Sequence, residues 1–120
     1  MASPLRPVYL RLRDRIAAGI IDGTWAAGAL LPSVRTLAAE EGANPLTVAK
    51  AYQQFQDEGL VRVQRGIGLF VEPDAAETLR RREREQFLRE EWPLVAERIR
   101  LLAIRPEDLP GLPLRADENV

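Results

Sequence analysis

The side chains that most often do chemistry in proteins are scarce in this sequence. Its 120 residues include no cysteine and no histidine, which excludes disulfides, thiol nucleophiles, thiolate or imidazole metal sites and His-based catalysis. Composition leaves open a carboxylate metal site or an acid pair. However, Glu40-Glu41 and Glu90-Glu91 are sequence neighbours on predicted helices, so their side chains point in different directions. We therefore predict a protein that is not an enzyme and that uses no metal and no cofactor.

Polar side chains with hydrogen-bonding groups lie instead along one predicted helix between Pro45 and Gly59. Val48, Tyr52 and Phe55 recur at i, i+4 and i+7, which is the repeat of an amphipathic helix. Off this apolar face lie Thr47, Lys50, Gln53, Gln54 and Asp57. Asn44 is expected to cap the start of the helix, where Pro45 loses nothing by lacking an N–H group.

Two more helices are predicted before this one. Tyr9, Leu12, Ile16 and Ile20 recur at offsets of three and four, which indicates an amphipathic helix over residues 8–22. Ser33 can cap a second helix that follows Pro32 and ends at Gly42. The stretch 24–31, which includes Trp25, is interpreted as a buried connection.

The second and third helices together have the form of a helix-turn-helix. They are about eight and fifteen residues long, and the turn between them has three or four residues and contains Gly42. Ala38 provides the small residue at the helix crossing, Gly42 the left-handed turn residue and Val48 the apolar anchor.

A β-hairpin is predicted to follow the third helix. Residues 60–65 and 69–72 are rich in β-forming side chains, and Gly66-Ile67-Gly68 between them provides a permissive turn. A lone Gly-x-Gly with no helix after it does not indicate nucleotide binding. One helix, a helix-turn-helix and a hairpin make a winged helix-turn-helix of about 65 residues.

Residues 74–105 are predicted to form two helices, separated at Trp92-Pro93. Leu94, Val95, Ile99 and Leu102 form an apolar stripe on the second of them. Helices this short cannot bury such a stripe by themselves, so something must cover it.

The net charge of −1 is unevenly distributed along the chain. Residues 1–71 have eight basic and six acidic side chains, whereas residues 72–120 have nine basic and twelve acidic ones. This asymmetry suggests different partners for the two parts. No apolar run approaches the roughly 18–20 residues of a membrane span, and the first residues lack the apolar core of a signal peptide. We expect a cytoplasmic protein with no membrane contact.

Several motifs occur in a fixed order along residues 7–72. They are Leu31-Pro32-Ser33 with Arg35 and Leu37-Ala38, Asn44-Pro45 with Thr47-Val48 and Lys50-Ala51-Tyr52, Glu58-Gly59-Leu60, and Arg65-Gly66 with Gly68 and Phe70-Val71. In this order they resemble the GntR family of bacterial transcriptional regulators. Tyr9-Leu10 with Leu12, together with Asn44-Pro45 and Ala51-Tyr52, resembles its short YtrA subfamily. Residues 73–109 match more loosely, through length and helix pattern.

The sequence departs from the family pattern at four positions. Ala27 stands where proline is usual, and Thr36 where glutamate is frequent. Ile67 and Leu69 replace the basic and hydroxyl residues common at the tip of the hairpin. This last difference lowers the contribution expected from the hairpin to any contact with DNA.

The resemblance implies a sequence-specific DNA-binding regulator, most simply a repressor. It also implies a homodimer that binds an inverted-repeat operator, and it allows an unidentified small-molecule effector. Independently of the family, the second helix of a helix-turn-helix enters the major groove with its N-terminal residues at the base edges. The predicted DNA-binding residues are Arg35, Asn44, Pro45, Leu46, Thr47, Lys50, Gln54, Arg65 and Gly66, with Arg11 and Arg15 as further candidates.

The expected fold is therefore mainly α with a small β-hairpin. Residues 1–73 are predicted to form the winged helix-turn-helix, residues 74–109 a helical dimerisation segment and residues 110–120 a flexible tail. Similarity to the family implies that a second copy covers the apolar stripe. The predicted dimer interface is Phe87, Leu88, Trp92, Val95, Ile99 and Leu102.

A rival interpretation is a winged helix that binds another protein and does not bind DNA specifically. The nearly neutral net charge and the apolar tip of the hairpin favour it. Salt-dependent binding to DNA from the chain's own genomic neighbourhood would separate the two.

Overall fold

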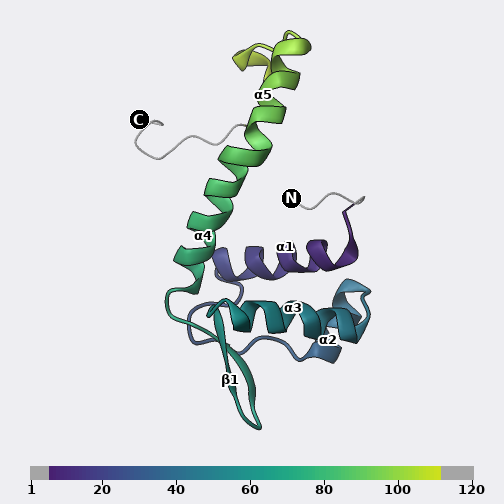
Figure 1. Ribbon diagram of the computed structural model, residues 1–120, viewed down its shortest axis with the longest axis vertical. Helices are drawn as coiled ribbons and strands as arrows, with labels where there is room; N and C mark the ends of the chain where they lie inside the picture. The colour runs from purple at the N-terminus through teal and green to yellow at the C-terminus, as the bar shows by residue number, and fades with distance from the viewer. Residues whose placement is uncertain (1–5, 112–120) are drawn as a thin grey trace. The chain divides into compact units, whose positions relative to one another are not determined.

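The computed structural model describes residues 6–111 and is mainly helical, with one two-stranded antiparallel sheet (Figure 1). The boundary between two compact units falls after Glu83. The first unit contains α1 (Val8–Ile21), α2 (Val34–Glu41), α3 (Pro45–Asp57), β1 (Val61–Gln64), β2 (Gly68–Val71) and most of α4 (Ala75–Gln86). These elements confirm the predicted mainly α fold with a winged helix-turn-helix and a small hairpin.

Local capping interactions define the turn between α2 and α3. The Ser33 hydroxyl accepts a hydrogen bond from the Thr36 N–H at 3.1 Å, and the Asn44 side chain accepts one from the Leu46 N–H at 2.8 Å. Gly42 ends α2 in the left-handed conformation, with φ of 64°, which costs glycine little because it has no Cβ. The two predicted caps and the predicted glycine turn are confirmed.

The core of the first unit lies where α1, α2 and α3 meet. Ile16, Leu37, Val48 and Phe55 are completely buried there. Ile16, Val48 and Phe55 come from the predicted apolar faces of α1 and α3, and Leu37 and the small Ala38 are the buried residues of α2. Because the helices share this core, the positions of α2 and α3 relative to one another are fixed by packing as well as by their short turn.

The hairpin pairs Val61 with Val71 and Gln64 with Gly68. Leu30 and Leu31, in the stretch that precedes α2, pair with the free edge of β2. The Leu31 N–H donates to the Leu69 carbonyl at 2.9 Å, and Leu30 forms a β-bridge with Phe70. The prediction that residues 24–31 are buried is wrong. Most of their side chains are exposed, with Trp25 partly and Leu31 fully buried. The backbone of this stretch finds partners at a sheet edge, which leaves one face of it open to solvent.

The second unit continues from α4 through a π-helical turn, η1 (Phe87–Glu91), into α5 (Trp92–Leu101) and a short 3-10 helix, η2 (Pro106–Asp108). The expected break at Trp92-Pro93 is instead this wider turn, in which the Trp92 N–H donates to the Phe87 carbonyl. Pro93 has no N–H to donate to the carbonyl four residues earlier, and the widened turn accommodates this loss.

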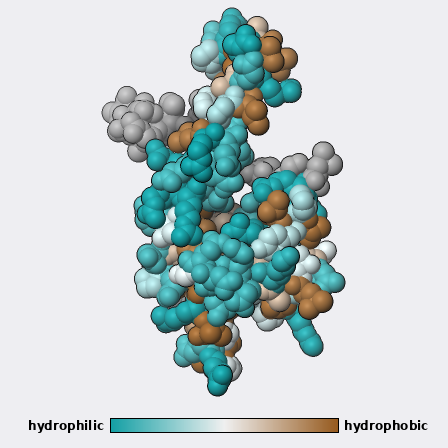
Figure 2. Space-filling model, viewed as in Figure 1, coloured by the Kyte–Doolittle hydropathy of each residue, from teal (hydrophilic) through white to brown (hydrophobic). Residues whose placement is uncertain are grey.

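Apolar side chains are prominent on the surface of the second unit, as the brown atoms around α5 show (Figure 2). In residues 6–111, no helix combines the length and the apolar character needed to cross a membrane. Most of the predicted tail, residues 112–120, lies outside the described residues.

Candidate nucleic-acid interface

The N-terminal end of α3 presents its side chains to solvent. Asn44, Pro45, Leu46 and Lys50 are exposed, and Thr47 is half-buried. Leu46 is 79% exposed, which is high for a large apolar side chain. An exposed leucine and a half-buried threonine, beside an amide and an ammonium group, can contact thymine methyls, base edges and phosphates. Pro45 has no N–H, and the N–H groups of Leu46 and Thr47 already donate to the side chain and the carbonyl of Asn44, so contacts at this end of α3 would come from side chains.

Lys50 has a neighbour that the sequence analysis did not assign to the site. Its ammonium nitrogen lies 5.2 Å from the centre of the Tyr9 ring of α1, within the range of a cation–π contact. In the sequence, Tyr9 was recognised as part of an apolar helix face and of a family motif, and not as a site residue. No signal in the sequence links two residues that are 41 positions apart in this way.

Gln54 is held at the other end of α3. Its side-chain amide donates to the Glu58 carboxylate at 2.8 Å. The amide is therefore engaged within the protein, in contrast to the exposed side chains at the N-terminal end of the helix. The sequence analysis placed Gln54 one turn deeper along the DNA-facing side, and that role stays a prediction.

Four exposed arginines of the first unit have no carboxylate partner among residues 6–111: Arg11, Arg35, Arg65 and Arg81. By contrast, the guanidinium of Arg15 lies 3.5 Å from the Glu41 carboxylate and 4.9 Å from the Trp25 ring. An unpaired guanidinium is available to bind a phosphate or a guanine edge. The geometry therefore favours Arg11 over Arg15 as an additional contact.

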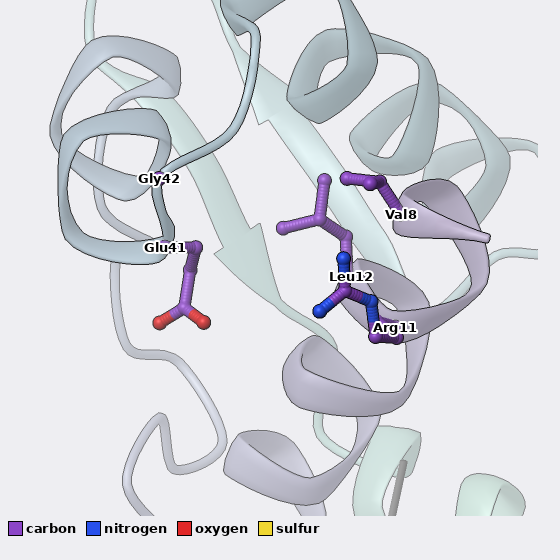
Figure 3. Close-up of a pocket in the computed structure, with 5 residues that line it drawn as sticks. All are labelled: Val8, Arg11, Leu12, Glu41 and Gly42. Carbon is purple, nitrogen blue, oxygen red and sulfur yellow. The ribbon is translucent and has the colours of Figure 1, made fainter. Parts of the chain in front are cut away.

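Arg11 lines a small pocket between α1 and the end of α2 (Figure 3). The pocket has a volume of about 80 Å³, and its other lining residues are Val8, Leu12, Glu41 and Gly42. A second pocket, of about 220 Å³, lies between the hairpin and residues 30–34 and is lined largely by apolar side chains. Both volumes are below the roughly 300–1,000 Å³ typical of small-molecule sites.

The turn of the hairpin, here called the wing tip, combines one cation with apolar side chains. Arg65 and Gly66 are exposed in it, and Gly66 has φ of 81°, which favours glycine. Ile67 is 58% exposed. The wing tip can therefore approach a phosphate through Arg65, while Ile67 offers no hydrogen bond.

Tyr52 joins the middle of α3 to the start of α2. Its hydroxyl donates to the Pro32 carbonyl at 2.7 Å, and burial raises the pKa of the tyrosine well above its ordinary value. The hydroxyl therefore remains protonated and keeps donating this bond. The contact holds α3 against the segment that leads to Ser33 and Arg35.

The predicted dimer residues lie in the second unit. Phe87, Leu88, Trp92, Val95 and Leu102 are exposed and Ile99 is half-buried, while the rings of Phe87 and Trp92 are 6.5 Å apart. Leu94 and Leu101, which were not among the predicted interface residues, are 70% and 65% exposed. Leu94 was recognised only as part of the apolar stripe. The exposure of both residues was not deducible from the helix period.

Comparison with known proteins places this arrangement among bacterial regulators. Residues 8–71, more than half of the chain, match the family described as "Bacterial regulatory proteins, gntR family". The HTH-type transcriptional repressor YtrA of Bacillus subtilis is 37% identical over 73 residues, which cover 61% of this chain and 56% of YtrA. The chain spans about half the length of the curated relatives that it matches first.

Solved structures show the same fold. A GntR family transcriptional regulator from Listeria monocytogenes has a TM-score of 0.70 and 28% sequence identity, covering 88% of this chain and 91% of that one. AraR(DBD) in complex with operator ORE1 has a TM-score of 0.53 and 25% identity, covering 59% of this chain and 88% of that one. The ordered motifs, the winged helix-turn-helix and the family match agree, and this chain belongs to the gntR family of bacterial regulatory proteins.

Proposed function

We propose that this protein is a sequence-specific DNA-binding transcriptional regulator that acts as a repressor and not as an enzyme. The observation that carries the proposal is the exposed N-terminal end of α3, within a winged helix-turn-helix of the gntR family. The name of the similar YtrA, a transcriptional repressor, and the AraR complex with operator DNA support it. The protein would act in the cytoplasm, where DNA is accessible.

Each proposed DNA-binding residue has a role suited to its chemistry. Asn44, Leu46, Thr47 and Lys50 would contact base edges in the major groove. The Gln54 amide would have to break its hydrogen bond to Glu58 before it could contact a base. Pro45 would shape the start of α3. Arg35, and Arg65 with Gly66 on the wing, would bind the phosphate backbone next to the groove.

We further propose that the regulator is a homodimer, with residues 1–73 as the DNA-binding domain and residues 74–109 as the dimerisation segment. The exposed apolar side chains of the second unit support this, because a second copy would remove them from water. A two-fold dimer would also bind two half-sites, which gives the contact area that a single winged domain lacks.

A second candidate function is a protein-binding winged helix. The net charge of −1 and the exposed Ile67 at the wing tip favour it. Of the two described pockets, neither reaches the volume of a usual small-molecule site, so they provide no support for an effector.

Titration of the full chain with DNA from upstream of its own gene would test the proposal. Fluorescence anisotropy at several salt concentrations should give specific binding that weakens as salt rises, since phosphate contacts release counterions. A scrambled DNA of the same length is the control. Equal affinity for both DNAs, or no binding to either, would favour the protein-binding alternative.

A further inference from the structure

One carboxylate in the first unit accepts hydrogen bonds from three helices. Glu58, at the end of α3, accepts from Arg13 of α1 at 3.2 Å, from Gln54 of α3 at 2.8 Å and from Arg82 of α4 at 3.1 Å. Its side chain is only 24% exposed. We call Arg13, Gln54, Glu58 and Arg82 the Glu58 cluster.

Within this cluster, Arg13 packs against the core of the first unit. The guanidinium of Arg13 lies 5.2 Å from the centre of the buried Phe55 ring. Its Nε is buried and has no hydrogen-bond partner among the described residues. A partly desolvated cation needs a carboxylate nearby, so Arg13 and Glu58 hold each other in place. The cluster therefore has a firm base on α1 and α3.

The Arg82 side extends this base to α4. Ala75, Leu79 and Arg82 recur at i, i+4 and i+7 and so share one face of α4. The first two are buried in the core of the first unit, and Arg82 binds Glu58. Arg80 adds a bond to the Ile21 carbonyl at the end of α1, at 3.3 Å. The apolar contacts thus hold the first turns of α4, and the bond to Glu58 holds it one turn further along.

We propose that Glu58 is a positioning residue that, through Arg82, restricts the spacing between the two DNA half-sites that the dimer accepts. This inference rests on the proposed function, in which residues 74–109 join two DNA-binding domains. α4 is the helix through which the chain leaves the first unit, and Glu58 is attached to the end of the recognition helix α3. The cluster therefore limits how α4 can pivot relative to the helix that reads DNA.

The distances involved make this restriction relevant to DNA. The part of α4 beyond Leu79 has seven residues, 80–86, and is about 10 Å long, so a tilt of about 20° there moves its far end by about 3–4 Å. That displacement is close to the rise of one base pair, about 3.4 Å. A change in the tilt of α4 beyond Leu79 would therefore change half-site spacing by about one base pair.

The test compares spacing preference in two variants of the full chain. Arg82→Gln removes the bond from α4 and leaves Arg13 paired with Glu58. Arg81→Gln is the matched control, because it removes the same charge from an exposed neighbour with no ion pair among residues 6–111. Affinities are measured on inverted repeats whose half-sites are moved apart or together one base pair at a time. The readout is the ratio of the affinity at the best spacing to the affinities at the two neighbouring spacings.

We expect this ratio to fall about fivefold in Arg82→Gln, as for the loss of one partly buried ion pair, and to stay unchanged in Arg81→Gln. Arg82→Lys, which keeps the charge, should retain most of the preference. An unchanged ratio in Arg82→Gln, or an equal loss of affinity at every spacing, would overturn the inference while leaving the proposed function intact. A wild-type protein with no spacing preference would overturn both the inference and the proposed dimer.

Discussion

The ammonium group of Lys50 lies 5.2 Å from the centre of the Tyr9 ring. The contact links the recognition helix α3 to the first turn of α1, which begins at Val8. Lys50 is the only lysine of the chain, and its flexible side chain is held here by an aromatic face. Tyr9 thereby adjoins the candidate DNA interface through its contact with Lys50.

Replacing Tyr9 with leucine should weaken DNA binding about two- to fivefold, because an exposed cation–π contact contributes about 0.5–1 kcal/mol. Tyr9→Phe keeps the ring and should bind like the wild type. Fluorescence anisotropy with operator DNA measures both. Equal or tighter binding by Tyr9→Leu would mean that the ring does not prepare Lys50 for DNA.

Alanine substitution of Lys50 or Thr47 should each weaken operator binding by about 1–3 kcal/mol, since these side chains lie at the end of α3 that enters the groove. Thermal stability should change little, because Lys50 is exposed and Thr47 only half-buried. Gln53→Ala is the control on the same helix, where the exposed Gln53 donates a hydrogen bond to Asp57 at 2.9 Å. Unchanged affinity in both variants would remove α3 from the interface.

Arg35 and Arg65 are expected to bind phosphates. Alanine substitution of either should lower affinity across DNA sequences and reduce the slope of log K against log salt by about 0.9. Arg62→Ala is the matched control for the wing, because Arg62 is 3.5 Å from Glu72 and already paired. If Arg65→Ala leaves the slope as it was, the wing tip makes no phosphate contact.

Glutamate at both Ile99 and Leu102 should produce a folded monomer, since a second copy could no longer cover the apolar face of α5 without burying charge. Light scattering should give the wild type twice the chain mass of 13.5 kDa and the double variant that mass alone. Arg98→Glu introduces the same charge at an exposed polar position and should remain dimeric. A monomeric wild type at micromolar concentration would reject the dimer.

The hydroxyl of Tyr52 should stabilise the fold in a pH-dependent way. Tyr52→Phe removes the bond to the Pro32 carbonyl and should lower the free energy of unfolding by about 0.5–1.5 kcal/mol at pH 7. Because folding raises the pKa of Tyr52, its stabilising effect is complete below about pH 10, the pKa in the unfolded chain, and is lost as the pH rises towards the folded pKa.

Urea unfolding of the wild type and Tyr52→Phe at pH 8 and pH 11 checks this. The advantage of the wild type should shrink at the higher pH, because only the wild type contains the Tyr52 hydroxyl. An advantage that is constant across this range would show that Tyr52 ionises as easily in the folded protein as in the unfolded one.

Features that depend on a few neighbouring residues were predictable from the sequence. The caps at Ser33 and Asn44, the left-handed Gly42 and the apolar faces of the three helices all follow from interactions within one or two turns of chain. The exposed start of α3 follows from the same periodicity. The exposure of most predicted DNA-binding residues could therefore be deduced without a structure, and their contacts with DNA stay predictions.

The tertiary structure decided which side chains meet across the chain. Arg13, Glu58 and Arg82 belong to three helices, and Lys50 meets Tyr9 from another part of the sequence. No local pattern encodes such pairs, since each depends on how the helices pack around the shared core. The same reason explains the wrong prediction for residues 24–31: their composition suggested burial, but a hydrogen-bonding edge of the hairpin was available to them only once the chain had folded.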